Sequence, residues 1–210
     1  MKWTQCSVGS LYANCYILED ELTKKALIID PGDEVEKLES IIAEHTLDPL
    51  AVLLTHAHFD HIGALDEVRE RWKIPAYLHR NESYWLHDAQ MNGSEFFPAT
   101  GPIHVHPAER LLRGEQNLII GPFSFFVLET PGHSPGGVSY YFKDDQVLFS
   151  GDSLFNGSIG RSDGFGADNE QLLNSVHDKL LTLPEQTCLC PGHGRVSTIA
   201  EEIRHNPFLF

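Results

Sequence analysis

Three histidines and an aspartate stand close together in the stretch Thr55-His56-Ala57-His58-Phe59-Asp60-His61. The apolar run from Leu50 to Leu54 comes directly before it and has the length and composition of a buried strand. Side chains alternate along an extended chain, so we expect His56, His58 and Asp60 to leave the strand end on the same side. His61 does not follow this alternation, and a helical pattern of apolar residues begins next to it.

This concentration of imidazole and carboxylate groups predicts a metal site. Neutral imidazole is the commonest metal ligand in proteins, and the chain has 12 histidines. Four ligands from one short segment are difficult to place around a single ion, which indicates two adjacent metals that share the segment. The alternative is a polar loop with solvated histidines, but surface loops seldom concentrate imidazole in this way.

The composition predicts a soluble globular protein that acts on small molecules. Of the 210 residues, 41% are hydrophobic and 21% are charged, enough for one domain with a substantial core. The net charge of −15 argues against nucleic acid or a membrane surface as a partner, because both require clustered Lys and Arg. No signal peptide or membrane-spanning run is visible, so we expect a cytoplasmic protein; its oligomeric state stays open.

The four cysteines lack the paired CxxC motifs of a structural zinc knuckle. Cys188 and Cys190 alternate along a predicted strand. We expect both to be small buried hydrophobic residues.

Strands and helices alternate along the first part of the chain. Hydrophobic patterns predict two strands within residues 3–20, strands at 25–30, 50–54 and 76–79, a helix whose buried face begins at Val35, a helix from about 61 to 72, and a short helix at 81–88. This alternation predicts an α/β layered fold.

The rest of the chain is richer in strands. Glycines and prolines interrupt every pattern from residue 89 to 115, and long loops of this kind often form binding walls, so we expect substrate contacts there. Strands are predicted at 118–120, 123–129, 138–142, 146–150 and about 187–190, and helices at about 169–181 and 197–205.

Three further strand ends place a metal-competent residue beside glycine: Thr130-Pro131-Gly132-His133, Ser150-Gly151-Asp152 and Cys190-Pro191-Gly192-His193. Glycine lets the backbone turn sharply, so the neighbouring side chain can reach inward. With the first cluster, these segments supply seven ligands, a number that suits two metals with open positions. Asp30 in Asp30-Pro31-Gly32 is either a turn residue only or the hydrogen-bond partner of a metal-binding imidazole.

At this point the sequence resembles the metallo-β-lactamase superfamily, whose pattern His-x-His-x-Asp-His, a later His, a later Asp and a final His is matched throughout. The resemblance spans almost the whole chain and implies a four-layer αββα sandwich with the metal site at one edge of the two sheets. It implies two divalent metal ions, zinc foremost and iron or manganese as alternatives. One ion would be bound by His56, His58 and His133, the other by Asp60, His61 and His193, with Asp152 bridging them and Asp30 in the second shell.

Within the superfamily, the chain looks like glyoxalase II, and most like its small bacterial single-domain hydrolases. The resemblance rests on residues 130–136, 150–155, 158–163 and 205–208. It implies hydrolysis of a thioester such as S-lactoylglutathione to a 2-hydroxy acid and a free thiol, with Asp60 orienting the nucleophile or taking its proton. Asp152 counts against the antibiotic-cleaving relatives, which typically lack the bridging aspartate or replace a ligand with cysteine. We expect residues 1–210 to form a single domain without the C-terminal helical domain through which larger glyoxalase II enzymes hold glutathione.

Two alternatives remain open. Sulfur dioxygenases of the persulfide type share this scaffold, and their single iron would be held by His56, His133 and Asp152. Arg161 could pair with a substrate carboxylate, or with Asp163 or Asp168 to shape its own loop. Substrate recognition would fall to residues 89–115 and 153–168.

Overall fold

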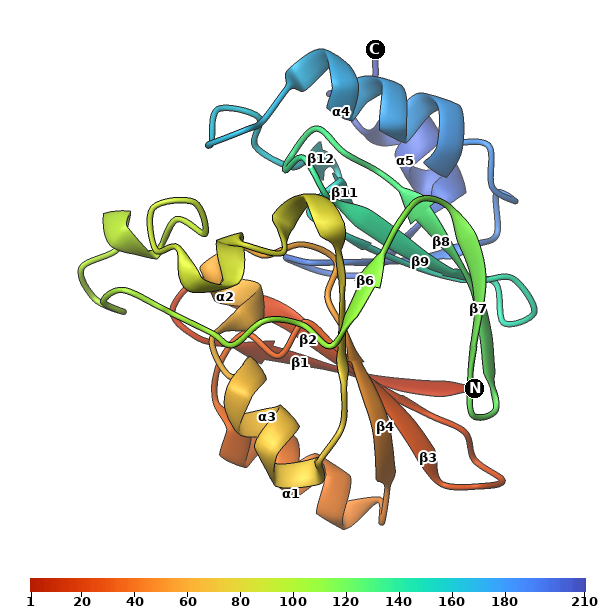
Figure 1. Ribbon diagram of the computed structural model, residues 1–210. Helices are drawn as coiled ribbons and strands as arrows, with labels where there is room; N and C mark the ends of the chain where they lie inside the picture. The colour runs from red at the N-terminus through yellow and green to blue at the C-terminus, as the bar shows by residue number, and fades with distance from the viewer. The chain divides into compact units, whose positions relative to one another are not determined.

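The computed structural model describes all of residues 1–210, which divide into two compact units. The N-terminal unit comprises Met1–Leu112 and Ile119–Phe123, and the C-terminal unit comprises Arg113–Leu118 and Ser124–Phe210. One six-stranded sheet lies in the N-terminal unit, and a second is built mainly by the C-terminal unit (Figure 1). None of the helices has the length and apolar character needed to cross a membrane.

The first sheet has the strand order β1-β2-β3-β4-β5-β6. The pairs β1–β2 and β2–β3 are antiparallel, whereas β3–β4, β4–β5 and β5–β6 are parallel. The strands are β1 (Lys2–Val8), β2 (Ala13–Glu19), β3 (Lys25–Ile29), β4 (Asp48–Leu53), β5 (Ala76–His79) and β6 (Arg110–Leu112). Parallel neighbours need a crossover connection. The helices α1 (Val35–Glu44) and α3 (Leu65–Trp72) provide the crossovers from β3 to β4 and from β4 to β5.

The core of the N-terminal unit forms where these two helices cover the sheet (Figure 1). Leu38 of α1, Leu65 of α3 and Ile28 of β3 are fully buried members of one apolar cluster. Each such side chain contributes about 1.5–3 kcal/mol through its burial. The strands that carry the candidate ligands therefore rest on a rigid base.

The second sheet has the order β14-β13-β10-β9-β8-β7. Its strands are β7 (Gln116–Ile120), β8 (Phe123–Glu129), β9 (Val138–Phe142), β10 (Val147–Gly151), β13 (Cys188–Pro191) and β14 (Ser197–Thr198). Leu172 of α4 (Asn169–Ser175) and Ile199 of α5 (Ile199–His205) pack with Leu148 and Leu189 of the sheet in a second buried cluster. A small hairpin of β11 (Leu154–Phe155) and β12 (Ser158–Ile159) follows β10.

The strands predicted at 25–30, 50–54, 76–79, 123–129 and 138–142 are confirmed to within two residues at each end. The helix expected from about 61 to 72 is instead two helices, α2 (Phe59–Ile62) and α3. At the break, the Ala64 N–H leaves the helical pattern and donates to Pro31 O at 3.0 Å, and Gly63 packs so closely on Gly32 that a Cβ there would lie 2.3 Å from the Gly32 carbonyl oxygen. Asp60 therefore belongs to a helix, and the predicted alternation ends at His58.

Other differences involve very short elements. The single helix expected at 81–88 is two 3₁₀ turns, Arg80–Glu82 and Trp85–His87. Within residues 89–115 the structure has the edge strand β6, and after Asp152 it has the hairpin β11–β12, neither of which was predicted. Strands of two or three residues are too short to establish a period-two pattern.

All four cysteines are free thiols. Cys190 is buried as expected, but Cys188 is only partly buried. The hydrogen bond between the two lowers the pKa of the Cys188 thiol to about 7, while burial raises the pKa of Cys190.

Candidate metal centre

Asp30 organises the histidines of the N-terminal unit. It stands directly after β3, is 1% exposed, and has a φ of 50°, a left-handed conformation that is uncommon outside glycine. Its Oδ2 lies 3.0 Å from His61 Nδ1, and its Oδ1 accepts the backbone N–H of Thr55 at 2.8 Å. A carboxylate accepts hydrogen bonds, so it holds the proton of His61 on Nδ1.

The same carboxylate reaches His56 through a hydroxyl group. Thr55 Oγ1 donates to Asp30 Oδ2 at 2.6 Å and lies 3.0 Å from His56 Nδ1. Because the hydroxyl proton is used toward Asp30, the oxygen is available to accept the Nδ1 proton of His56. One buried aspartate thus fixes the tautomer and orientation of two imidazoles, His61 directly and His56 through Thr55.

His58 and Asp60 lie next to these histidines. The rings of His56 and His58 are 4.7 Å apart and nearly perpendicular, and Asp60 Oδ2 is 3.8 Å from His61 Nε2. The His61 side chain is fully buried, whereas that of Asp60 is 14% exposed. The first cluster therefore combines oriented imidazoles with a carboxylate that solvent can reach.

A second buried carboxylate holds the backbone between two of these histidines. Glu82 is 0% exposed, and its Oε2 accepts the N–H of Ala57 at 2.6 Å. Ala57 separates His56 from His58, so this bond restrains both. Sequence reasoning missed Glu82, which is 25 residues away from Ala57.

We expect Glu82→Leu to weaken metal binding by about 10- to 100-fold, the range found when groups that orient metal ligands are removed. The change leaves the Ala57 N–H without its acceptor and frees the His56–His58 segment. Chelator competition measures the affinity, with Glu82→Gln, which retains an acceptor, expected to fall between the two proteins. Glu70→Leu on the exposed side of α3 is the control, and wild-type affinity in Glu82→Leu would contradict the prediction.

In the C-terminal unit, Asp152 lies between two histidines. Its Oδ2 is 3.6 Å from His133 Nε2 and 3.5 Å from His193 Nε2. The His133 side chain is 6% exposed, that of Asp152 10% and that of His193 26%. Three strand ends separated by many residues along the chain thus bring their predicted ligands to one place.

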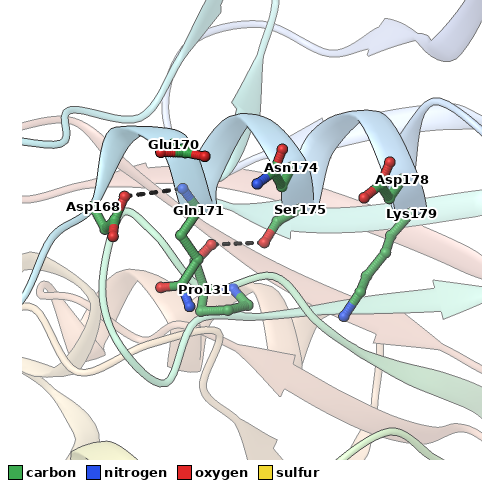
Figure 2. Close-up of a pocket in the computed structure, with 8 residues that line it drawn as sticks. All are labelled: Pro131, Asp168, Glu170, Gln171, Asn174, Ser175, Asp178 and Lys179. Atoms are coloured by element: carbon green, nitrogen blue, oxygen red, sulfur yellow. Dashed lines mark hydrogen bonds between the residues drawn. The ribbon is translucent and has the colours of Figure 1, made fainter.

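His133 is oriented by a backbone carbonyl and by helix α4. Its Nδ1 lies 2.8 Å from the carbonyl oxygen of Arg161, which can only accept a hydrogen bond. Ser175 Oγ of α4 donates to Pro131 O at 2.7 Å, and a Cβ on Gly132 would lie 2.2 Å from the backbone nitrogen of Leu172. Figure 2 shows this flank of α4 facing Pro131, with a surface hollow that contains none of the seven candidate ligands.

The chemistry of these donors fits a transition metal. In His56, His61 and His133, Nδ1 carries the proton and faces Thr55, Asp30 or the Arg161 carbonyl, so the lone pair is on Nε2. Neutral imidazole with a fixed Nε2 lone pair is the usual state of a metal-binding histidine. Zinc, iron and manganese all accept histidine and aspartate ligands.

The two segments expected to contact substrate are held by internal hydrogen bonds. Within residues 89–115, the side-chain amide of the fully buried Asn92 donates to Trp85 O at 3.1 Å and Ile103 O at 2.9 Å, and the Asn92 backbone carbonyl accepts Phe59 N at 3.0 Å. The loop is thereby tied to the start of α2. In the second segment, Arg161 Nε donates to Asp163 Oδ1 at 2.8 Å, which lowers the pKa of Asp163. Asp168 caps α4 instead, and a substrate contact by Arg161 stays a prediction.

Comparison with known proteins identifies the family. The family model described as Metallo-beta-lactamase superfamily matches residues 8–193. The chain belongs to the metallo-β-lactamase superfamily. It is 53% identical to "Probable metallo-hydrolase YqgX" of Bacillus subtilis, over 100% of this chain and 98% of the relative. The crystal structure of BLEG-1 B3 metallo-beta-lactamase superposes with a TM-score of 0.96 at 50% identity, covering 99% of both chains. The predicted metallo-β-lactamase fold is confirmed.

Other relatives carry more specific names. TTHA1623, solved in a di-iron-bound form, has a TM-score of 0.86 and 40% identity, covering 98% of this chain and 100% of its own. "Hydroxyacylglutathione hydrolase GloC" of Haemophilus influenzae is 34% identical over 96% of this chain and 95% of the relative. ETHE1 from Myxococcus xanthus has a TM-score of 0.79 and 30% identity, covering 99% and 84%. The chain is thus an enzyme of a metallo-hydrolase superfamily with groups able to bind metal.

Proposed function

We propose that this protein is a cytoplasmic, metal-dependent hydrolase of small-molecule thioesters such as S-lactoylglutathione, releasing a 2-hydroxy acid and a free thiol. The observation that carries the proposal is the complete donor set, above all Asp152 within 3.6 Å of both His133 and His193. The similarity to GloC along nearly the full length of both proteins supports the choice of substrate.

The proposed centre would hold two divalent metal ions. His56, His58 and His133 would hold one ion, Asp60, His61 and His193 would hold the other, and Asp152 would serve both. We propose zinc as the metal, with iron and manganese as alternatives. The di-iron-bound form of TTHA1623 supports iron as one of these alternatives. Such ions lower the pKa of bound water to about 7 and polarise carbonyl groups.

The protein's own residues supply orientation and proton transfer. Asp60 is the partly exposed carboxylate of the first cluster, and we assign it the role of orienting the attacking water and accepting its proton. The C–S bond of the thioester breaks as the new C–O bond forms, and the thiol leaves as a thiolate, a good leaving group that needs no dedicated acid. Asp30 and Thr55 keep two imidazoles in the required tautomer throughout.

The test is thioester cleavage by metal-loaded protein, followed as thiol release, with and without oxygen. Hydrolysis consumes only water, so we expect equal rates in both and no oxygen uptake with glutathione persulfide. Oxygen uptake with persulfide by the iron-loaded protein, and no thioester cleavage with any metal, would replace the hydrolase with the sulfur dioxygenase. The similarity to ETHE1 keeps that second candidate in the experiment.

BLEG-1 is described as a B3 metallo-beta-lactamase, so the same assay should also include a β-lactam substrate. A β-lactam such as a cephalosporin is offered to the same metal-loaded protein. The earlier argument from Asp152 predicts that thioesters are cleaved with the higher kcat/KM. Faster cleavage of the β-lactam would overturn the proposed substrate class.

We expect metal-replete protein to bind about two ions per chain, because seven ligands exceed what one ion accepts. His61→Ala and His193→Ala should each lower the content toward one, measured by elemental analysis after gel filtration. His106→Ala, a change at an exposed histidine paired with Asp66, is the control. A content that never exceeds one ion and is unchanged in both site variants would contradict the dinuclear centre.

A further inference from the structure

Arg195 is an exposed cation on the segment that carries the candidate ligand His193. It follows His193 by two residues, and its Nε donates to Asn156 Oδ1 at 2.6 Å. Asn156 follows Phe155, whose ring lies 6.0 Å from the His193 ring at an angle of 82°. The guanidinium is therefore anchored on the β11–β12 hairpin, the same hairpin whose Phe155 ring faces the predicted ligand His193.

The anchor is itself held by buried groups. Asn156 Nδ2 lies 3.2 Å from Oε1 of Glu202, which is 1% exposed and also accepts the N–H of Gly157 at 2.7 Å through Oε2. The fully buried Asn206 donates to the same Oε2 at 2.9 Å and to Ser158 O at 2.9 Å. Asn206 belongs to the tail segment that carried part of the family resemblance, and its role here is to fix the hairpin. Together, Glu202 and Asn206 give Asn156 one orientation, and Asn156 in turn directs Arg195.

The guanidinium of Arg195 forms no ion pair within the protein. Arg161 is paired with Asp163, and Arg204 with Glu185, whereas Arg195 has no carboxylate partner. An arginine whose Nε is already engaged still offers its two Nη groups to a planar anion. In a protein of net charge −15, an anionic ligand gains most from a cation that is both oriented and unneutralised.

We propose that Arg195 binds a carboxylate of the thiol part of the substrate; this rests on the thioester hydrolase proposed above. In a thioester of a monocarboxylic 2-hydroxy acid, the acyl carboxyl group is consumed by the C–S linkage. Any carboxylate in the intact substrate therefore belongs to the thiol. The enzyme then selects thioesters of carboxylate-bearing thiols, of which glutathione is one, over those of neutral thiols.

The experiment is equilibrium binding of S-methylglutathione, a thioether that cannot be hydrolysed, measured by calorimetry on metal-loaded protein. We expect Arg195→Gln to raise its Kd about tenfold, the effect of losing a charge-assisted hydrogen bond at an exposed site. The dimethyl ester of the same probe lacks both carboxylates, and we expect it to bind wild type about tenfold more weakly than the acid and to be little affected by the substitution. Arg204→Gln, which removes an exposed arginine of α5, is the matched control.

The outcomes separate the two proposals. Failure of wild type to bind the acid more tightly than the ester overturns the role of Arg195 without any variant. An equal loss for acid and ester in Arg195→Gln also overturns it, since that result indicates a role in hairpin structure only. Cleavage of S-lactoyl-N-acetylcysteamine, a thioester without carboxylates, tests the hydrolase independently of Arg195.

Discussion

Replacement of Asp152 by alanine should lower thioester hydrolysis by about a thousandfold or more while leaving the fold intact. In the proposed centre this carboxylate would contact both ions and balance much of their charge. Removing it takes away several kcal/mol of stabilisation, and each ~1.4 kcal/mol corresponds to a factor of ten in rate. We expect the loss to exceed that of any single histidine variant, as measured by kcat/KM on metal-loaded proteins.

The fold should survive because Asp152 stands at a strand end, next to Gly151 at the end of β10, and not in the apolar core. Bound metal stabilises a folded protein by mass action, so the melting curves are compared after chelation. There we expect the variant within about 5 °C of wild type. Asp144→Ala, in the exposed turn between β9 and β10, is the control and should retain activity. Near-normal turnover of Asp152→Ala with both metals bound would show that Asp152 is not the bridging ligand.

The ligand candidates could be found from sequence because their signal is local. Four of the seven candidates lie within one short stretch, which includes Asp60, and the other three follow strands beside glycine. The buried strands are equally visible, since β3, β4, β9 and β10 each consist mostly of apolar residues. Such features depend on neighbouring residues only, which is what a pattern along the chain reports.

The groups that orient the ligands could not be found in this way. Asp30 was recognised as one of two alternatives, but the link through Thr55 depends on a contact across 25 residues. Glu82 is likewise 25 residues from Ala57, whose N–H it accepts, and it lies in a 3₁₀ turn that is too short to show a hydrophobic pattern. His133 is oriented by the carbonyl of Arg161, and a carbonyl is present at every residue, so the side chain carries no signal for it.

The failed prediction for Asp60 has the same origin. The alternation from Leu54 was extended through His58 to Asp60, but α2 begins at Phe59. The helix is capped by Gly63, which packs closely on Gly32 of the Asp30-Pro31-Gly32 turn. Tertiary hydrogen bonds flank this helix, from Phe59 N to Asn92 O at its start and from Ala64 N to Pro31 O after its end, and no pattern along the chain reports them. The close packing on Gly32 leads to a second large effect.

Gly32→Ala should destabilise the protein by about 3 kcal/mol or more, at the upper end of what overpacking costs. A Cβ at this position would lie 1.7 Å from the carbonyl oxygen of Asp60, and a backbone atom in the first turn of α2 can move only if the ligand segment moves with it. We therefore also expect metal content to fall. Urea unfolding of the metal-free protein measures the first effect, and elemental analysis the second.

Gly164→Ala is the matched control for this substitution. Neither glycine has a positive φ, and a Cβ on Gly164 would meet nothing within 4 Å. Both changes reduce the entropy of the unfolded chain to the same extent, so the difference between the two variants isolates the steric cost of the close approach. We expect Gly164→Ala to stay within about 1 kcal/mol of wild type. If Gly32→Ala unfolds at the same urea concentration as Gly164→Ala and retains its metal, the contact between the Asp30-Pro31-Gly32 turn and α2 does not position the ligand segment.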